Sequence, residues 1–423
     1  MQQPGILNSS RHAVFVQGNA SRFFLRLAHA LEGEGFGVSR VNICGGDYVF
    51  WGHWRARDYR GRREDFPRFI AGHFAQSGCT DLVLHNDCRP YHRMAVAEAR
   101  ARGIAVWCFE EGYLRPNWLC LEKGGLNGYS PLPDDPGWYL RTAKTLPRYD
   151  ADIAVGDGFR ERVRSDFLWQ GANYAYLWRF PHYRTHRPYP IWAEYLTWCR
   201  RLVVLKRRHR AARALVDHLA ADRPPFFLYA LQLDSDSQIR VHSGFGRLVP
   251  SIEAVVASFA AHAPGQALLV VKNHPLDNAW LNLPRITRDI ARRYEAGERV
   301  RFIDGGNLDA LNKAARGVVT VNSTAGLTAL TQGAPVFALG TAVYGIAGLT
   351  SGGTLDEFWS RPQPPDPELL GAFLRVLRHA SLVNGNYYTE EGVRAAVAES
   401  VRRIAARRSI LDDAPRPARW RAG

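Results

Sequence analysis

The chain has 423 residues, of which 46% are apolar, so it is long enough for two domains and can bury a real core. This composition excludes a disordered chain, and the sequence contains no internal repeat. The formal net charge of +15 indicates an acidic partner, such as a nucleotide, an anionic sugar or an anionic lipid, unless the arginines simply form a solvated surface.

The sequence also argues against a membrane-spanning protein and against a protein held together by disulfides or zinc. No signal peptide is visible, and no apolar stretch reaches the roughly 20 residues that a membrane helix needs. We therefore expect a cytoplasmic protein that is soluble or peripheral on the membrane. The six cysteines lack C-x-x-C spacing, which predicts free thiols rather than a zinc site or a disulfide framework.

Strands and helices alternate in the first half of the chain. Apolar runs predict strands over 12–18, 37–43, 81–87 and 103–112. Apolar residues at helical spacing predict a helix after the first strand and another over about 90–102, and we expect Gly45, Gly46 and Asp47 to form a loop. This alternation predicts a parallel, doubly wound sheet.

The segment 159–219 mixes tryptophan and tyrosine with arginine. An apolar stripe at helical spacing consists of Ile191, Tyr195, Trp198, Leu202 and Leu205. Around it lie Arg200, Arg201, Lys206, Arg207, Arg208, Arg210 and Arg213. This pattern fits a basic amphipathic helix on anionic lipid, and it equally fits a helix that bridges two domains with its arginines solvated. A nucleic-acid surface is disfavoured, because no known nucleic-acid-binding module is present.

The second half repeats the alternation. We expect strands over 225–232, 267–273, 300–304, 317–322 and 334–340, and helices over 247–262, 285–296, 308–315 and 323–332. Two further helices over 366–408 are expected to pack back across a central cleft. The fold class is therefore α/β, with two Rossmann-like domains of the GT-B glycosyltransferase type. The predicted divisions are an acceptor domain (1–158), a helical connector (159–222), a nucleotide-sugar domain (223–362) and C-terminal helices (363–423).

Two adjacent carboxylates end the strand predicted over 103–112. Glu110 and Glu111 suit acid–base chemistry, because like charges held close raise one of the two pKa values. Gly112 allows a sharp turn and the close approach of a ligand, and Arg115 is suited to bind a carboxylate or a phosphate through two hydrogen bonds. The alternative is a solvated turn with a local Glu–Arg ion pair.

Two further motifs follow strands of the second half and suit a phosphate. His274, between Lys272 and Pro275, can donate to a phosphate oxygen and help a leaving group depart, although a structural histidine is the alternative. A second group opens a helix and forms an anion site, or simply its N-cap: Asn322, Ser323, Thr324 and Gly326. The helix dipole and His274 would carry the leaving-group charge, so we expect neither a metal nor a cofactor.

A third group follows the strand over 225–232. Asp234 and Asp236 lie two residues apart after Gln232 and are candidates for a nucleophile or base, with an Asx turn as the alternative. His242 and Ser243 come shortly after and are suited to orient a carboxylate.

Polar residues also follow the strands of the first half. By their position they are expected to face an acceptor rather than a donor: Gln17, Gly46, Asp47, Asp87, Arg89 and Arg115. For Asp87 the alternative is a helix N-cap ahead of Pro90. The chain has no Walker-type phosphate loop, no well-placed G-x-G-x-x-G and no G-x-S-x-G, which argues against NTPases, dinucleotide dehydrogenases and hydrolases of the nucleophile-elbow type.

Several segments together resemble the capsular polysaccharide biosynthesis and export family, and within it most closely the β-Kdo transferases of the KpsS type. These segments are FEEGYLRPNWLCLEKGGLNGYS, LQLDSDSQIRVHSGF, VVKNHPLDN and VNSTAGLTALTQGAPVFALGTAVYG, with FVQG, RVNICGGDYVFW and NDCRPYH before them. The resemblance runs from about residue 13 to 350. Only one copy is present, unlike the two-module KpsC type.

The resemblance implies transfer of the sugar acid Kdo from CMP-Kdo, with retention, to a phosphatidylglycerol-type lipid at the inner face of the bacterial inner membrane. It implies Asp236 as the nucleophile by its Q-x-x-x-D pattern, and Glu110 or Glu111 in proton transfer or acceptor positioning. The phosphate of CMP would be held by His274, Ser323 and Thr324, and Lys272 would meet that phosphate or the Kdo carboxylate. Other capsule assembly proteins are possible partners, and nucleic acid is not.

Two alternatives remain open at the level of sequence. The same acidic, His-Pro and Ser-Thr motifs resemble bacterial GT-B sialyltransferases, which use CMP-sugars and invert the anomeric centre. There Glu111 would be the base and Asp236 would not be needed as a nucleophile. The other alternative is a non-catalytic export or scaffold component that binds the glycolipid.

Overall fold

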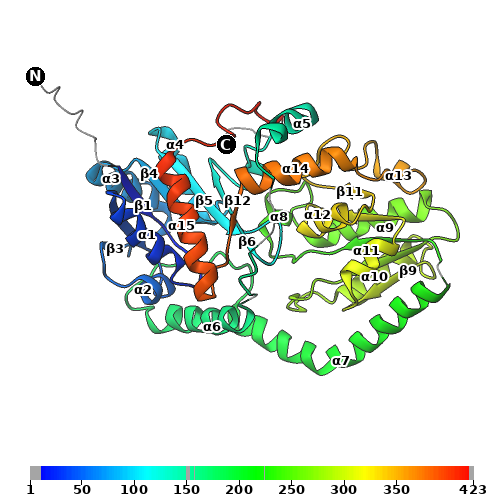
Figure 1. Cartoon of the computed structure of the whole chain (residues 1–423). Helices are drawn as coiled ribbons and strands as arrows, with labels where there is room; N and C mark the ends of the chain where they lie inside the picture. Colours follow the sequence, from blue (N-terminus) through cyan, green and yellow to red (C-terminus); the bar gives the residue numbers. More distant parts are fainter. Residues whose placement is uncertain (1–10, 149–152, 157, 223, 419–423) are drawn as a thin grey trace, which may run out of the picture.

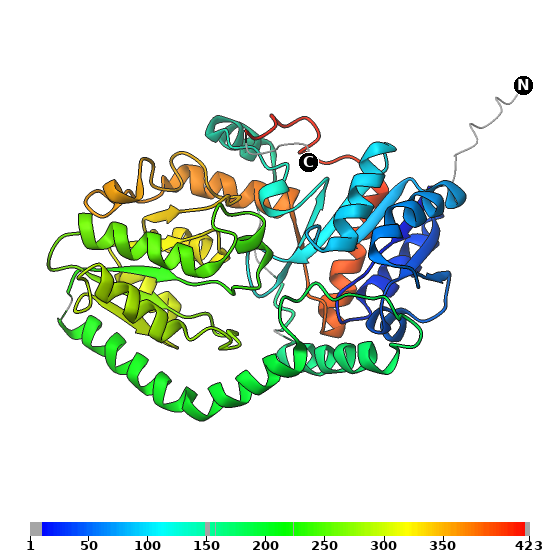
Figure 2. The same ribbon diagram turned by 180° about the vertical axis from the view of Figure 1, so that it is seen from behind.

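The computed structural model describes residues 11–148, 153–156, 158–222 and 224–418. Within these residues the chain forms two α/β lobes side by side, each built around its own sheet (Figure 1; Figure 2 shows the back). The predicted fold class, two Rossmann-like lobes in the GT-B manner, is confirmed. The domain boundaries given above stay predictions.

The sheet of the first lobe has seven strands in the order β12-β6-β5-β4-β1-β2-β3. Their bounds are β1 (His12–Phe15), β2 (Gly37–Asn42), β3 (Ala56–Asp58), β4 (Asp81–His85), β5 (Ala105–Glu111), β6 (Trp118–Lys123) and β12 (Leu382–Asn384). All four strands predicted in this half are present. Strands β1 to β5 pair in parallel, whereas β6 runs antiparallel to both β5 and β12.

The antiparallel strand β6 corrects the expectation of a fully parallel sheet, and its cause is local. The Gly112 N–H donates to the Trp118 carbonyl over 2.9 Å, which closes a hairpin directly after β5. A Cβ atom on Gly112 would lie 2.3 Å from that oxygen, so no larger residue fits here. The close approach that Gly112 permits is therefore between two stretches of backbone, not between backbone and ligand.

The sheet of the second lobe has five strands, all parallel, in the order β11-β10-β7-β8-β9. Their bounds are β7 (Phe226–Ala230), β8 (Leu268–Lys272), β9 (Val300–Ile303), β10 (Gly317–Thr320) and β11 (Val336–Ala338). Every residue of β7 is buried, as expected for a strand in a parallel sheet whose two faces are covered. All five predicted strands are confirmed.

Helices cover both sheets. Those of the first half are α1 (Phe23–Gly33), α2 (Gly45–Trp51), α3 (Phe66–Ser77), α4 (Pro90–Ala101), α5 (Pro136–Thr145) and α6 (Phe159–Ala175). Those of the second are α8 (Ser237–Arg240), α9 (Leu248–His262), α10 (Leu283–Arg293), α11 (Leu308–Ala314), α12 (Thr324–Thr331) and α13 (Leu355–Phe358). The expected loop at Gly45–Asp47 is wrong: these residues form the first turn of α2, because Asp47 accepts the Ile43 N–H and pairs with Arg40.

The C-terminal segment crosses back from the second lobe to the first. Helix α14 (Pro367–Ala380) leads into β12 of the first sheet, and α15 (Glu390–Ala406) packs on α1 (Figure 1). Ile404 of α15 shares a buried cluster with Phe23 and Phe24 of α1. The two helices expected over 366–408 are present, and the strand between them was not predicted, since three residues carry no periodic signal.

Helix α7 (Ile191–Asp222) runs along one edge of the molecule toward the second lobe (Figure 1). Its Arg201 is 2% exposed, pairs with Asp304 at 2.6 Å and donates to the carbonyl oxygen of Pro275 at 2.9 Å. This burial corrects the expectation that all its arginines are solvated. Arg201 instead fastens the helix to the second lobe, because a buried guanidinium is stable only when an anionic partner offsets its loss of hydration.

The outward face of α7 also differs from the predicted stripe. Tyr195, Trp198 and Leu205 are half-buried, and the side chain of Ile191 lies outside the described residues. Leu202 of the stripe is 57% exposed, and the other exposed apolar side chains of α7 are Trp192, Leu196, Val203 and Val204, at 67%, 57%, 84% and 38%. Tyr195 stacks on Phe167 of α6, and Trp198 lines a cavity with Trp280 of the second lobe, so these two stripe residues point inward.

Candidate active site

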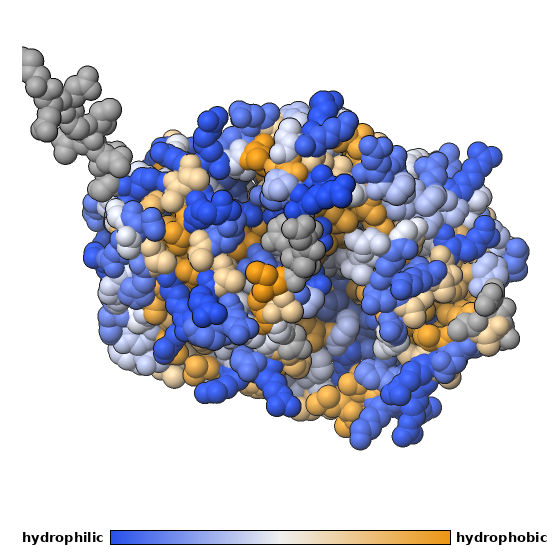
Figure 3. Space-filling view, in the orientation of Figure 1, coloured by the Kyte–Doolittle hydropathy of each residue, from blue (hydrophilic) through white to orange (hydrophobic). Residues whose placement is uncertain are grey.

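A cavity of about 210 Å³ lies between the two lobes, at the carboxyl ends of their strands. Figure 3 shows the surface hollowed between the lobes. Glu110 and Glu111 reach the cavity wall from the end of β5. Asp236, His274 and the 322–324 segment reach it from the second lobe. Residues more than 200 positions apart in the sequence therefore surround one space.

Glu110 is held by two asparagines. Asn86 donates to one carboxylate oxygen at 3.0 Å and Asn127 to the other at 2.6 Å. Both asparagines adopt positive φ, a conformation that asparagine tolerates better than most residues. Burial raises the pKa of Glu110 to about 7, a rise that the Asp236 charge adds to and the two amide hydrogen bonds oppose. A carboxyl group with this pKa exchanges protons readily at neutral pH.

Glu111 has a different environment at the edge of the cavity. Its carboxylate pairs with Arg162 of α6 at 3.3 Å, and both side chains are partly exposed. The alternative of a local pair between Glu111 and Arg115 is not seen, because Arg115 donates to the Gly112 carbonyl and otherwise faces the cavity as an exposed cation. The two neighbouring glutamates are thus separated into a buried, asparagine-bound group and an ion-paired group.

Asp236 and Asp234 point into different spaces. Asp236 lines the cavity and accepts the Gln238 N–H at 2.9 Å, which is also the Asx-type contact expected at a helix start. Burial raises the pKa of Asp236, and the Gln238 N–H and Arg115 partly offset that rise. Of the two aspartates, only Asp236 lines the cavity that contains Glu110.

Asp234 lies on a second, neighbouring cavity and has structural partners. It accepts hydrogen bonds from the Tyr189 hydroxyl at 2.6 Å and from the Leu248 N–H at 2.9 Å, and it pairs with Arg247. Although burial acts to raise the pKa of Asp234, these hydrogen bonds lower it overall. Asp234 therefore ties the segment before α9 to the connector.

His274 presents one ring nitrogen to the cavity in a defined protonation state. Its Nδ1 accepts the Leu276 N–H at 3.1 Å, so the proton of the neutral ring sits on Nε2. Burial, with nearby cations such as Arg115 and Lys272, lowers the pKa of His274 to about 4. At neutral pH the ring is therefore an uncharged donor, which suits a hydrogen bond to a phosphate oxygen.

Asn322, Ser323 and Thr324 line the cavity at the start of α12. Ser323 is the N-cap and accepts the Ala325 N–H at 3.1 Å, so the capping alternative holds alongside the exposure of this helix end to the cavity. Gln232 fixes Asn322 with two hydrogen bonds, one to its side chain at 3.1 Å and one from its backbone N–H at 3.2 Å. The segment thus presents a helix N-terminus and two hydroxyl groups to the cavity.

Three expected donor-binding residues lie behind the wall rather than on it. Lys272 is buried, and burial lowers its pKa. Pro275 accepts from Arg201 through its carbonyl, so it connects the His274 turn to α7. A Cβ on Gly326 would lie 2.3 Å from the hydroxyl of Tyr344, a residue of the cavity wall. These residues shape the site without facing a ligand.

Of the expected acceptor-binding residues, only Arg115 lines the cavity. Gln17 and Arg89 bind each other at 3.2 Å, and Arg89 also donates to the Gly18 carbonyl. Asp47 pairs with buried Arg40 at 2.6 Å, and a Cβ on Gly46 would meet the ring of Trp169. Their polar groups are occupied within the first lobe, so no acceptor contact is inferred from them.

Asp87 and His242 correct two smaller expectations. Asp87 does not cap α4: its carboxylate accepts the Leu126 N–H at 2.9 Å. His242 does not orient Asp236, since its Nε2 lies 3.2 Å from the Sγ of Cys88 in the first lobe. Ser243 donates to the Ile239 carbonyl. The side chain of His242 thus meets the other lobe outside the cavity.

Sequence analysis missed Asn86, Asn127, Arg162 and Tyr344 as site residues. Asn86 and Asn127 stand within segments that carried the family resemblance, one next to Asp87 and the other before Gly128. Their position was a usable signal, but nothing in the sequence indicates that both amides meet Glu110. Arg162 belongs to the connector, where many arginines occur and spacing does not single it out.

Fold and cavity together define a two-lobed α/β protein whose cleft offers carboxylates on one side and an anion site on the other. The model of the family described as capsule polysaccharide biosynthesis protein matches residues 80–388. The chain therefore belongs to the capsule polysaccharide biosynthesis protein family, and the resemblance stated from the motifs is confirmed.

Two relatives are similar over nearly the whole chain. The capsule polysaccharide modification protein LipB of Neisseria meningitidis serogroup A is 33% identical, over 91% of this chain and 93% of LipB. The capsule polysaccharide export protein KpsS of Escherichia coli is 32% identical, over 90% of this chain and 98% of KpsS. A solved structure of Thermosulfurimonas dismutans KpsC, described as a beta Kdo 2,7 transferase, has a TM-score of 0.44 at 15% identity and covers 94% of this chain and 99% of that one. At that level of similarity the KpsC structure says nothing about the activity of this chain.

Proposed function

We propose that this protein is a glycosyltransferase that moves Kdo from CMP-Kdo, with retention of configuration, to a phosphatidylglycerol-type lipid. The product would be the first sugar of a capsule linker. The observation that carries the proposal is that Asp236, Glu110, His274 and Ser323 line one cavity between two lobes. Membership in a capsule biosynthesis family supports it, as do the motifs that resemble β-Kdo transferases.

The donor would bind with its phosphate on the second lobe. The start of α12 supplies the Ser323 and Thr324 hydroxyls and the positive end of the helix dipole, and the Nε2–H of His274 supplies one more donor. These groups stabilise the negative charge that grows on the CMP phosphate as the glycosidic bond breaks. Arg115, exposed on the cavity wall, is placed to meet the carboxylate of the sugar acid.

Retention requires two displacements. In the first, a carboxylate oxygen of Asp236 attacks the anomeric carbon, the bond from that carbon to the phosphate oxygen breaks, and CMP leaves with the electron pair. The Gln238 N–H, which binds the other side of this carboxylate group, fixes its direction. The product of this step is a Kdo ester of Asp236.

In the second displacement, the acceptor hydroxyl attacks the anomeric carbon and the Asp236 carboxylate departs. The hydroxyl proton passes to Glu110, whose raised pKa matches it to this task at neutral pH. Glu111, paired with Arg162, would help to position the acceptor at the edge of the site. Assignment of the base to Glu110 rests on its burial and its two asparagine partners.

A lipid acceptor fits the outward surface of the connector. Trp192, Leu196 and Val203 follow helical spacing and are exposed on α7 beside exposed Arg200 and Arg207. Figure 3 shows apolar and hydrophilic side chains next to one another along this edge. Such a surface binds anionic lipid by shallow insertion plus charge attraction. None of the helices in the described part of the chain has the length and apolar character to cross a bilayer.

The test is to incubate the purified protein with CMP-Kdo and a fluorescent lyso-phosphatidylglycerol. We expect a Kdo-bearing lipid with the anomeric configuration of the donor. A product of opposite configuration that still forms in Asp236→Ala would favour the inverting reaction with Glu111 as base. Absence of any product from folded protein that binds CMP-Kdo would contradict the enzyme and favour a glycolipid-binding scaffold.

A further inference from the structure

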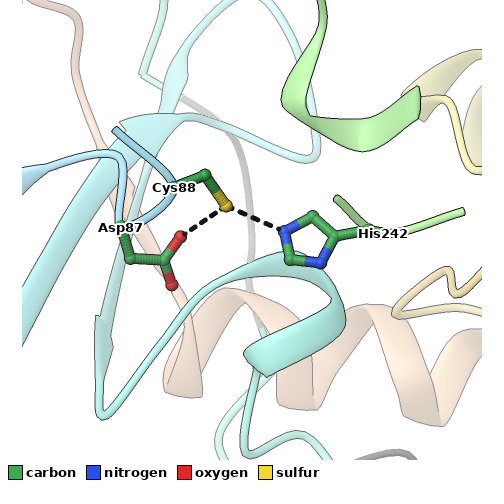
Figure 4. Close-up of side chains that lie close together, drawn as sticks. All are labelled: Asp87, Cys88 and His242. Carbon is green, nitrogen blue, oxygen red and sulfur yellow. Dashed lines mark hydrogen bonds between the residues drawn. The ribbon is translucent and has the colours of Figure 1, made fainter. Parts of the chain in front are cut away.

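Three potential metal ligands meet where the lobes touch, outside the cavity described above. Asp87 and Cys88 lie between β4 and α4 of the first lobe, and His242 lies after α8 of the second (Figure 4). One ligand atom from each side chain lies within 4.8 Å of the other two. Asp87 is 5% and His242 is 5% exposed, so this is a largely buried cluster.

The cluster has fewer hydrogen-bond protons than it has acceptor atoms. The Sγ of Cys88 lies 3.4 Å from Oδ1 of Asp87 and 3.2 Å from Nε2 of His242 (Figure 4). A thiol carries one proton, which can satisfy one of these two neighbours. If the thiol donates to Asp87 and Nε2 of His242 carries no proton, a sulfur lone pair faces a nitrogen lone pair. A cation between the three atoms would turn all three lone pairs into favourable contacts.

We propose that Asp87, Cys88 and His242 bind a divalent metal ion of the zinc class and thereby clamp the two lobes together. Thiolate, imidazole and carboxylate are the three ligand types that zinc accepts, commonly in a tetrahedral arrangement. The fourth position would hold water from a neighbouring cavity, whose wall includes Asp87, Cys88 and Tyr129. The two negative ligands cancel the charge of the ion, so no net charge is buried.

Contacts outside the cluster already hold each ligand in place. Oδ2 of Asp87 accepts the Leu126 N–H at 2.9 Å, which leaves Oδ1 for the ion. The backbone N–H of Cys88 donates to Asn86 at 2.9 Å. The ring of His242 packs edge-on against Tyr129, with 4.8 Å between ring centres. Such supporting contacts orient metal ligands and strengthen binding.

The same contacts connect the cluster to the active-site cavity from both lobes. Asn86, which binds the Cys88 backbone, also donates to Glu110 at 3.0 Å. The carbonyl oxygen of His242 accepts from Asn322 at 3.1 Å, and Asn322 lines the cavity. A metal clamp would thus set the distance between Glu110 and the phosphate-binding segment. Its ligands are positioning residues and touch no substrate.

Metal content and cobalt spectroscopy test the proposal without any assay of sugar transfer. We expect purified protein to bind one equivalent of Zn²⁺, and Co²⁺ in its place to give the near-ultraviolet charge-transfer band of a thiolate ligand. Cys88→Ser removes that band, and His242→Gln weakens Co²⁺ binding by more than about tenfold. Cys199→Ser, which changes an exposed cysteine on α7, is the matched control and keeps both.

Thermal unfolding guards against a variant that fails to fold. Addition of Zn²⁺ to metal-free wild type should raise Tm, and the rise should be absent in Cys88→Ser. A wild-type protein that takes up no more Zn²⁺ than Cys88→Ser, or that binds Co²⁺ without a thiolate band, overturns the proposal. The cluster is then a metal-free hydrogen-bonded contact between the lobes.

Discussion

The carboxyl ends of the two sheets carry equally polar sequences, yet they do different things. In the second lobe Asp236, His274 and Ser323 follow separate strands, and all three line the cavity. In the first lobe Asp47 and Arg89 also lie just beyond strands, but their charges are satisfied by buried partners of the same lobe.

The difference shows that position after a strand does not suffice for a place in the site. A carboxylate that pairs with a buried cation, as Asp47 does with Arg40, is held within its lobe, because an unpaired buried charge is strongly unfavourable. Asp47 has the buried guanidinium of Arg40, whereas Asp236 accepts from the Gln238 N–H and the Ser237 hydroxyl and has no salt bridge among the described residues. Substitutions in one lobe at a time should therefore have different effects.

The largest effect is expected at Asp236. Asp236→Asn should lower transfer by at least about 10³-fold, because the amide cannot act as a nucleophile, while CMP binding stays measurable. The assay is initial-rate transfer with parallel calorimetric titration of CMP. Asp234→Asn is the matched control, since Asp234 lies on the neighbouring cavity, and its transfer rate should stay within a few-fold of wild type. Full activity in Asp236→Asn would remove this residue from the mechanism.

The next effect concerns the base on the first lobe. Glu110→Gln should lower transfer by about 10²-fold or more. In wild type the rate should rise with pH through about 7, as Glu110 loses its proton, and then level off. The pH profile of kcat/KM for the acceptor measures this limb, which the variant should lack. Glu111→Gln should keep it; loss of the limb in Glu111→Gln alone would reverse the assignment of the two glutamates.

Glu110 also predicts a pH dependence of stability. Its folded pKa is raised, so its favourable contribution is complete below its ordinary pKa of 4.5 and is lost as pH rises through about 7. This group alone should lower the free energy of unfolding by up to about 3 kcal/mol between pH 4.5 and 8. Denaturant unfolding of wild type and Glu110→Gln at both pH values measures it. An identical pH slope in the two proteins would contradict the raised pKa.

The first lobe should respond at Asp47 through stability instead of chemistry. Asp47→Asn leaves Arg40, which is 2% exposed, without its anionic partner and should destabilise the protein by about 3 kcal/mol. The transfer rate per folded molecule should stay near that of wild type. Asp65→Asn, on the surface, is the control and should change stability by less than about 0.5 kcal/mol. A large fall in the transfer rate with unchanged stability would show that Asp47 acts in the active site.

The smallest effect is expected on the connector. Trp192→Ala together with Val203→Ser should weaken binding to vesicles of anionic lipid by about tenfold, since both side chains are exposed and apolar. Vesicle co-sedimentation measures it. Ile153→Ala is the control, because Ile153 is exposed but lies outside α6 and α7. Equal binding by the double variant would show that this face does not dock on lipid.

Sequence alone predicted the repeated alternation well, because buried parallel strands read as apolar runs and the helices between them have their own period. It missed β3, β6 and β12, since a hairpin closed by Gly112 and strands of only three residues depend on tertiary contacts. It singled out Asp236, His274 and Ser323 at strand ends, and the structure brings all three to one cavity.

What sequence did not give was the partner of each polar group. Arg201 looked like one of many solvated arginines, and only the fold brings it to Asp304. Glu110 and Glu111 are neighbours in the chain, and their separation into a buried group and an ion-paired group comes from Asn86, Asn127 and Arg162. Such pairings join distant segments, so no local pattern encodes them.

One measurement tests the central claim most directly: the intact mass of the protein after exposure to CMP-Kdo without an acceptor. A double displacement in the cavity predicts a mass gain of one Kdo residue, mapped by peptide sequencing to Asp236 and absent from Asp236→Asn. Glu110→Gln should still acquire it, because Glu110 acts only in the second step. An enzyme that turns over but never carries the adduct, or carries it on another residue, would contradict this account.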